Sequence, residues 1–143
     1  MKVKILPSKT SGEVSAPPSK SFAHRYLIGS VLSRGKCVIN NIADSDDISA
    51  TLSCIEQLGG SVTKDGNIVT VIPTNEKQIE NAVFDCKESG STLRFFIPVV
   101  LATGAKNCTF LGSERLLARG IKEYEKIFEN SDVKIKSDEK SIE

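Results

Sequence analysis

Residues 16–25 read Ala16-Pro17-Pro18-Ser19-Lys20-Ser21-Phe22-Ala23-His24-Arg25 and mark a change from extended chain to helix. The two prolines exclude a helix before Ser19, and either Ser19 or Ser21 can cap the helix that follows. Apolar residues then recur at helical spacing, at Phe22, Tyr26, Leu27 and Val31. We therefore predict a helix from about Ser19 to Ser33, preceded by a short strand over residues 12–16.

The first turns of this helix carry the side chains expected of an anion-binding site. Unpaired backbone N–H groups and the positive end of the helix dipole favour an anion at a helix N-terminus. Lys20 adds a point charge, Arg25 a bidentate fork and Ser21 a hydroxyl group. Solvated surface charges beside an ordinary helix cap would look the same, so these residues alone leave both interpretations open.

Length and composition describe an ordinary globular chain of 143 residues, 39% hydrophobic and 26% charged, with a net charge of +1. This charge balance gives no reason to expect nucleic acid or an anionic membrane as a partner. No apolar run approaches the roughly 20 residues that a membrane span needs. The four cysteines lack C-x-x-C spacing, so we expect buried thiols in a cytoplasmic protein rather than disulfides or a metal site.

The order of the predicted elements repeats along the chain. Strand, helix, strand, helix and a hairpin with an Asp65-Gly66 turn are predicted over residues 12–73. The same order begins again over residues 81–143 and stops before its last strand. The fold class is therefore predicted as α+β, with about two βαβαββ units, the second incomplete. The further strands are expected over residues 2–7, 37–42, 61–64, 67–72, 82–86, 107–111 and 133–136, and the further helices over residues 44–58, 92–102 and 121–128.

The second unit contains a turn that matches the first, Ser89-Gly90-Ser91, and Arg94 follows it as Arg25 follows the first turn. Two helix N-termini directed at one point would concentrate positive potential on an anionic ligand. Asp47 either caps its own helix or holds the ammonium of Lys20 in place.

Two other side chains have more ordinary interpretations. Arg94 can serve only to brace its repeat, whatever the ligand. His24, the single histidine, has no partners at metal-ligand spacing, which favours a packing or surface role.

Four segments of the chain resemble, in the same order, segments of the 5-enolpyruvylshikimate-3-phosphate synthase (EPSP synthase) family. They are Pro17-Pro18-Ser19-Lys20-Ser21-x-x-x-Arg25, Asn41-Ile42-Ala43-Asp44-Ser45-Asp46-Asp47, Ser89-Gly90-Ser91-Thr92-Leu93-Arg94 and Leu111-Gly112-Ser113-Glu114-Arg115-Leu116-Leu117-Ala118-Arg119. The sibling UDP-N-acetylglucosamine enolpyruvyl transferase family differs at the first segment and is one alternative. A non-catalytic anion-binding module is the other.

The resemblance implies a cytoplasmic enolpyruvyl (carboxyvinyl) transferase of the shikimate pathway, which serves chorismate and aromatic amino-acid biosynthesis and is the target of glyphosate. Such enzymes transfer the enolpyruvyl group of phosphoenolpyruvate to the 5-hydroxyl of shikimate 3-phosphate, giving EPSP and phosphate, without a metal or cofactor. Residues 11–143 would form part of the shikimate-binding domain, with units at 12–73 and 81–143, and residues 1–10 would add a strand to the opposite domain. The general acid and base would lie beyond residue 143, so the chain alone is expected to be inactive or nearly so, and to self-associate through exposed domain surface.

The resemblance also assigns roles to individual residues. Shikimate 3-phosphate would be held by Lys20, Ser21 and Arg25, and phosphoenolpyruvate by Lys20, Gly90 and Arg119, with support from Asp47, Ser91 and Arg94. No metal site is implied. The chain departs from the family at two positions: Glu88 stands where the family commonly has Asn, and Gly120 where it usually has Pro. Either departure would weaken the binding of phosphoenolpyruvate, Glu88 by repulsion unless a cation such as Lys87 pairs with it.

Overall fold

Helices alternate with short strands along residues 2–4, 6–74 and 79–143, which the computed structural model describes. The mixed α/β class agrees with the prediction. In chain order the elements are α1 (Lys20–Val31), β1 (Cys37–Ile39), α2 (Asp46–Gln57), β2 (Ser61–Asp65), β3 (Ile68–Ile72), β4 (Val83–Asp85), α3 (Gly90–Ala102), β5 (Thr109–Leu111), α4 (Glu114–Ala118), α5 (Lys122–Phe128) and β6 (Ser141–Ile142).

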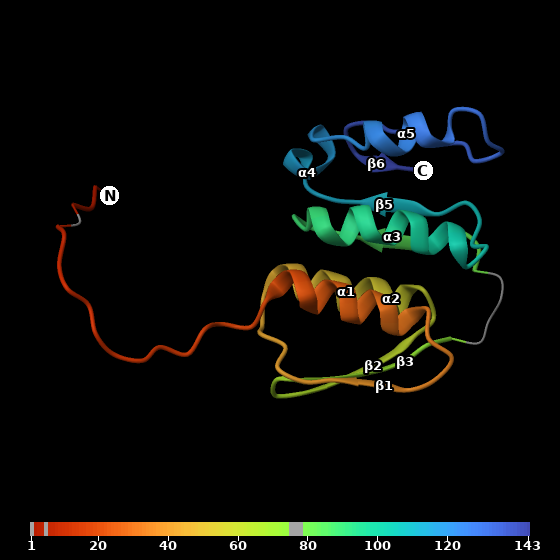
Figure 1. Cartoon of the computed structure of the whole chain (residues 1–143). Coiled ribbons are helices and arrows are strands. Elements are labelled where there is room, and N and C mark those ends of the chain that lie inside the picture. Colours follow the sequence, from red (N-terminus) through yellow and green to blue (C-terminus); the bar gives the residue numbers. More distant parts are fainter. Residues whose placement is uncertain (1, 5, 75–78) are drawn as a thin grey trace.

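The strands form two small sheets (Figure 1). The first has the order β1-β3-β2 and is antiparallel throughout, and the second has β4 parallel to β5 and β6 antiparallel to β5. Asp65 pairs with Ile68, so the hairpin turn is Gly66-Asn67, one residue later than predicted. Gly66 takes a φ of +55°, which glycine adopts without strain, and this conformation sets the position of the turn.

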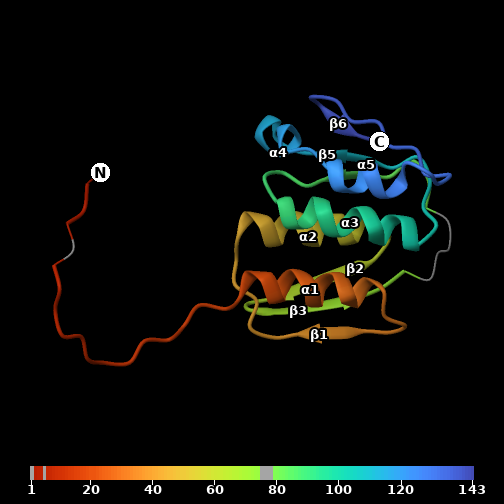
Figure 2. The same ribbon diagram turned by 45° about the horizontal axis from the view of Figure 1, so that its top comes forward.

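Helices α1 and α2 cover one face of the first sheet, and α3 packs on the other side of these two helices (Figures 1 and 2). The second sheet joins the same core through Phe84 of β4, whose ring lies 5.9 Å from Phe96 and 5.1 Å from Phe110, centroid to centroid. Burying an aromatic ring of this size contributes about 1.5–3 kcal/mol. No helix in the described part of the chain is long and apolar enough to cross a membrane.

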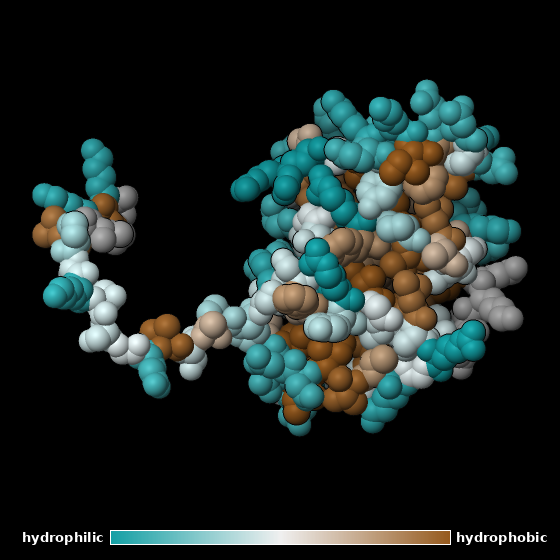
Figure 3. All heavy atoms as spheres, in the orientation of Figure 1, coloured by the Kyte–Doolittle hydropathy of each residue, from teal (hydrophilic) through white to brown (hydrophobic). Residues whose placement is uncertain are grey.

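The N-terminal part of the chain differs from the prediction in one segment. Residues 6–19 form no strand, although one was expected over residues 12–16. The strand expected over residues 2–7 was assigned to the opposite domain, so its absence at residues 2–4, 6 and 7 does not contradict the prediction (Ile5 lies outside the described residues). This arm stands clear of the body (Figure 3), and Val14 is 94% exposed. A strand is stable only beside another strand, and the described sheets place none next to the arm.

The buried face of α1 uses only part of the apolar pattern of its sequence. Phe22 and Tyr26, two of the four apolar residues at helical spacing, are each 61% exposed and stack on one another with ring centroids 6.2 Å apart. The buried apolar side chains are instead Ala23, Leu27, Ile28 and Val31. Apolar residues lie on two adjoining faces of this helix, and only the packing against α2, α3 and the sheet decides which face is covered.

The C-terminal region shows a similar shift. The pattern of the helix predicted over residues 121–128 places Ile127 on its inward face, but Ile127 of α5 is 67% exposed. The strand expected over residues 133–136 is not formed, because residues 141–142 take the place beside β5 as β6. At the end of the segment that was expected to form the strand, Lys136 exchanges two backbone hydrogen bonds of 2.7 Å with Glu143, the residue after β6.

Candidate functional site

Helices α1, α2 and α3 begin at the same end of the molecule, where the N-terminal arm leaves it (Figures 1 and 2). A serine caps each helix by accepting a hydrogen bond from a backbone N–H of the first turn, namely Ser19 in α1, Ser45 in α2 and Ser89 in α3. Because Ser19 is the cap, the hydroxyl of Ser21 is left for other partners. The positive ends of the three helix dipoles therefore gather at one end of the fold.

Lys20 is held by Asp47, as one of the two interpretations of Asp47 expected. The Nζ atom lies 2.7 Å from Asp47 Oδ2, with the two side chains 55% and 29% exposed. An ion pair this exposed contributes little to stability, about 0–1 kcal/mol. Its consequence is positional, because it holds the ammonium of α1 near the first turn of α2.

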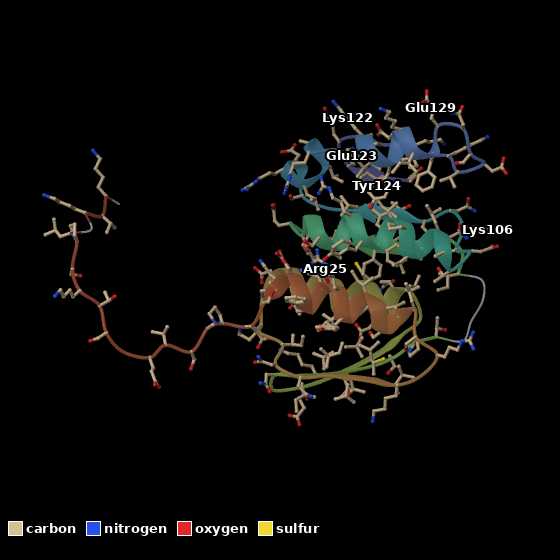
Figure 4. All side chains as sticks on the ribbon, in the orientation of Figure 1. Arg25, Lys106, Lys122, Glu123, Tyr124 and Glu129 are labelled. Atoms are coloured by element: carbon tan, nitrogen blue, oxygen red, sulfur yellow. The ribbon has the colours of Figure 1, made fainter. Side chains whose placement is uncertain are left out.

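Arg25 bridges α1 and α3. Its Nη1 donates a 2.8 Å hydrogen bond to the carbonyl of Ser21, and its guanidinium carbon lies 5.5 Å from the ring centroid of Phe95. Figure 4 shows Arg25 on the side of α1 that faces α3. A cation over an aromatic face is favourable. The guanidinium is thus fixed beside the helix that begins at Gly90.

Two further guanidinium groups meet at Gly90, the first residue of α3. A Cβ placed on Gly90 would lie 3.0 Å from Arg94 Nη1 and 3.5 Å from Arg119 Nη1. Glycine therefore leaves room for both arginines against the backbone. Among the described residues, the ion pairs present join lysines to aspartates and include none of Arg25, Arg94 and Arg119.

The loop that carries Arg119 is tied to the turn before α3. Leu111 accepts a 2.8 Å backbone bond from Cys86, and Ser113 donates another of 2.8 Å to Lys87. Gly112 permits this approach, since a Cβ there would lie 2.8 Å from Leu116 Cδ2 and 3.2 Å from the carbonyl oxygen of Lys87. The Leu111–Arg119 segment is therefore packed directly against the Ser89-Gly90-Ser91 turn.

Arg94 braces the end of this loop. Its Nη2 donates a 3.3 Å bond to the carbonyl of Gly120, and the hydroxyl of Tyr124 donates a 2.7 Å bond to the carbonyl of Arg94. Figure 4 shows Tyr124 on α5. The bracing role that the sequence allowed for Arg94 is present, and it lies next to the ligand position expected at Gly90.

Lys87 does not neutralise Glu88. Its Nζ lies 2.5 Å from Asp85 Oδ2, and this hydrogen bond from Lys87 is the main reason why the pKa of Asp85 is held below its usual value. Glu88 is exposed at the rim of the turn. A negative charge therefore stands near Gly90 without the lysine partner that the sequence offered.

Buried polar side chains lie behind the cationic cluster, and sequence reasoning missed their role. Thr51 and Thr92 are completely buried and hydrogen-bond to each other, and His24 is only 1% exposed, which agrees with a packing role. Burial lowers the pKa of His24; Lys20 and Arg25 act in the same direction and Asp47 acts against them. The sequence offered one signal for these residues, since each is a polar residue at a helix position that faces the core, where polar groups need hydrogen-bond partners.

The arrangement suits a small anion with more than one charged group. Four cationic side chains lie at one end of the fold, those of Lys20, Arg25, Arg94 and Arg119. The N-terminal N–H groups of α1 and α3 lie at the same end. Guanidinium and ammonium groups beside helix N-termini bind phosphate and carboxylate. Within the described residues, no group of three or more His, Cys, Asp or Glu could hold a metal ion.

Comparison with known proteins gives a consistent result. The family model for EPSP synthase (3-phosphoshikimate 1-carboxyvinyltransferase) matches residues 6–143. Curated proteins named 3-phosphoshikimate 1-carboxyvinyltransferase are similar: that of Clostridium novyi (strain NT) is 40% identical over 94% of this chain, and that of Clostridioides difficile (strain 630) is 41% identical over 99% of it. Another, from Clostridium perfringens (strain SM101 / Type A), is 41% identical over 99% of this chain. The chain spans about one third of the length of these relatives, 33%, 34% and 34% respectively.

Proposed function

The chain belongs to the EPSP synthase family, and from this premise we propose that it is the N-terminal part of a cytoplasmic enzyme of the shikimate pathway. That enzyme transfers the enolpyruvyl group of phosphoenolpyruvate to the 5-hydroxyl of shikimate 3-phosphate and releases phosphate. The relatives that match are named 3-phosphoshikimate 1-carboxyvinyltransferase, which favours this activity over that of the UDP-N-acetylglucosamine enolpyruvyl transferase family.

The observation that carries the proposal is the meeting of Arg94 and Arg119 at the backbone of Gly90, 3.0 and 3.5 Å from its Cβ position. Arg25 faces the same helix from α1 through its contact with Phe95. Both proposed substrates are anions that must lie side by side to react. A set of fixed cations and helix N-termini supplies this positioning and can stabilise the charge that develops in a tetrahedral intermediate.

The roles of the residues follow the motifs. Lys20, Ser21 and Arg25 bind shikimate 3-phosphate, and Lys20, Gly90 and Arg119 bind phosphoenolpyruvate. Asp47 orients Lys20, and Arg94 holds the loop of Arg119, while Ser91 supports the turn after Gly90. The general acid and base are supplied from outside this chain, so the chain alone binds ligand without turning it over.

The domain organisation is part of the same proposal. Residues 11–143 form part of the shikimate-binding domain, as two βαβαββ units at 12–73 and 81–143 of which the second is incomplete. Residues 1–10 pair as a strand only with the opposite domain, which agrees with the exposure of residues 2–4 and 6–10. Surface that the opposite domain would cover promotes self-association of the isolated chain.

Calorimetric titration of shikimate 3-phosphate into the chain tests the proposal. Lys20→Ala should lower the affinity about tenfold or more, because it removes a charge-assisted hydrogen bond to the phosphate. Lys106→Ala is the control, since it also removes one lysine charge, but Lys106 is exposed and lies at the opposite end of the fold (Figure 4). Its affinity should equal that of the unmodified chain.

Two results would overturn the proposal. One is the absence of binding by the unmodified chain. The other is an equal loss of affinity in the Lys20 and Lys106 variants, which would make the effect one of net charge rather than of a site.

A further inference from the structure

A chain of buried polar side chains connects α1, α2 and α3. His24 Nδ1 lies 2.8 Å from Thr51 Oγ1, Thr51 Oγ1 lies 2.7 Å from Thr92 Oγ1, and Thr92 Oγ1 lies 2.6 Å from Ser89 Oγ. Each of these four side chains is at most 1% exposed. Polar groups are unfavourable in a core unless they are hydrogen-bonded, so this interface depends on every member of the chain.

The two ends of this row of hydrogen-bonded side chains, His24 and Ser89, lie at the two turns of the proposed site. His24 stands one helical turn after Lys20, on the inward side of α1. Ser89 is the cap of α3 and directly precedes Gly90. The hydrogen bonds therefore run from behind the shikimate 3-phosphate turn to the residue that begins the phosphoenolpyruvate turn.

The direction of the hydrogen bonds follows from counting protons. Thr92 donates its hydroxyl proton to Ser89 Oγ, so it must accept from Thr51, and Thr51 must then accept from the N–H at His24 Nδ1. The backbone carbonyl of Asp47 is a second, longer acceptor for Thr51 and Thr92, at 3.1 and 3.4 Å.

The opposite direction is less favourable. It would place the histidine proton on Nε2, which is buried without a hydrogen-bond partner among the described residues. An unpaired buried N–H is rarer in proteins than an unpaired acceptor, so the proton belongs on Nδ1.

We propose that His24 is held as the neutral Nδ1–H tautomer and starts a one-way hydrogen-bond relay, His24 to Thr51 to Thr92 to Ser89, that fixes the Ser89-Gly90 turn relative to the Lys20-Ser21 turn. These four residues are positioning residues. The inference rests on the proposed function in one respect: two reacting ligands need their binding turns at a fixed separation. The lowering of the pKa of His24 by burial agrees with a neutral ring.

Nitrogen-15 NMR of the imidazole tests the tautomer without any ligand. The chain has one histidine, so the assignment is unambiguous. At about pH 7.5, where the ring is neutral, Nδ1 should be the protonated, pyrrole-type nitrogen and Nε2 the unprotonated one. Protonation at Nε2 in the unmodified chain would overturn the relay, whatever the variants do.

Hydrogen exchange of backbone amides tests the positioning. The probes are Ala23 N–H and Leu93 N–H, which donate to the carbonyls of the caps Ser19 and Ser89. Thr51→Val keeps the shape of the side chain but breaks the relay, and it should speed exchange at both probes about tenfold. Thr51→Ser keeps the hydroxyl and should restore slow exchange.

The matched control for exchange is Thr103→Val, which removes a 2.8 Å hydrogen bond to Val100 at the far end of α3. Thr103→Val should leave the exchange rates of both probes unchanged, even if it lowers the overall stability by as much as Thr51→Val does. Equal acceleration by Thr103→Val and Thr51→Val, or no acceleration by Thr51→Val, would contradict the proposal. If Thr51→Val does not fold, the tautomer of His24 in the unmodified chain still tests the proposal.

A ligand titration separates this inference from the proposed function. Thr51→Val should weaken the binding of shikimate 3-phosphate about fivefold, and Thr51→Ser should restore it. If the unmodified chain does not bind shikimate 3-phosphate, the proposed function fails while the NMR results still support the relay. If the ring is protonated at Nε2 but shikimate 3-phosphate binds, the relay fails and the proposed function stands.

Discussion

Gly120 illustrates how one residue determines the geometry of the loop after Arg119. Its φ is +64°, and its N–H donates a 2.8 Å bond to the carbonyl of Leu117 at the end of α4. Proline has neither this N–H nor access to a positive φ. The local backbone after Arg119 is therefore one that the proline usual in the family could not adopt.

Replacing Gly120 by proline should therefore destabilise the chain. We expect Gly120→Pro to lower the free energy of unfolding by about 3 kcal/mol or more, measured by urea denaturation. Gly120→Asn, which tolerates a positive φ and keeps the N–H, should lower it by about 1 kcal/mol or less. Equal stabilities of the two variants would show that the left-handed conformation at residue 120 is not required.

Some of the side chains around the site could be predicted from the sequence, and others could not. Lys20 and Arg25 were accessible because they stand near a helix start that two prolines and a serine define. Thr51 and Thr92 were not, because a threonine within a helix reveals nothing about a partner 41 residues away. Their role depends on which faces of α2 and α3 meet.

At the level of elements, the serine caps of α1 and α3 have different environments. Ser19 is exposed and accepts a 3.4 Å bond from the Phe22 N–H. Ser89 is 1% exposed and accepts both the Thr92 N–H, at 3.2 Å, and the Thr92 hydroxyl, at 2.6 Å. The two caps therefore look alike in the sequence, but only Ser89 is buried and accepts two hydrogen bonds.

Alanine substitution should separate these two caps. We expect Ser89→Ala to lower the free energy of unfolding by about 2 kcal/mol, because it leaves the buried Thr92 groups without their acceptor. Ser19→Ala should cost about 0.5 kcal/mol, since water can replace an exposed cap. Thermal unfolding followed by circular dichroism measures both, and a larger loss for Ser19→Ala would contradict this account.

Element boundaries were predictable where the signals were local. Apolar residues at helical spacing, Ile48, Leu52, Ile55 and Leu58, predict the buried face of the helix after Asp44-Ser45. Helix α2 buries Ile48 and Ile55, its cap Leu58 is also buried, and Leu52 is partly buried. The strand expected over residues 12–16 failed because β-propensity cannot supply a neighbouring strand. The shift of the last strand from residues 133–136 to β6 has the same cause.

For the whole molecule, the stability of the fold should depend on pH through one group. The pKa of His24 is lowered from its ordinary value of 6.5 by burial, with smaller contributions from Lys20 and Arg25 in the same direction and an opposing one from Asp47. The unfolded chain then binds a proton at a higher pH than the folded chain does. Acidification therefore favours unfolding below pH 6.5, and above it the effect levels off.

Urea denaturation at about pH 7.5, 6.5 and 5.5 measures this dependence. We expect the free energy of unfolding to fall toward the lowest of these values. His24→Gln should remove the slope, because the chain has no other histidine. The pKa values of Asp85 and Asp138 are lowered from 3.8, so neither carboxyl titrates in this range. A slope that persists in the variant would assign the dependence to another group.

The sequence by itself determined the helices α1, α2, α3 and α5, the hairpin and the turns at Lys20 and Gly90, because prolines, glycines, serine caps and periodicity act over a few residues. It did not predict α4 (Glu114–Ala118). Only the tertiary structure decided that Arg94 and Arg119 meet at Gly90, that Phe22 and Tyr26 face solvent, and that buried, hydrogen-bonded side chains connect α1, α2 and α3. The physical reason is that burial and hydrogen bonding of a side chain depend on elements far along the chain. Local sequence can nominate such residues but cannot bring them together.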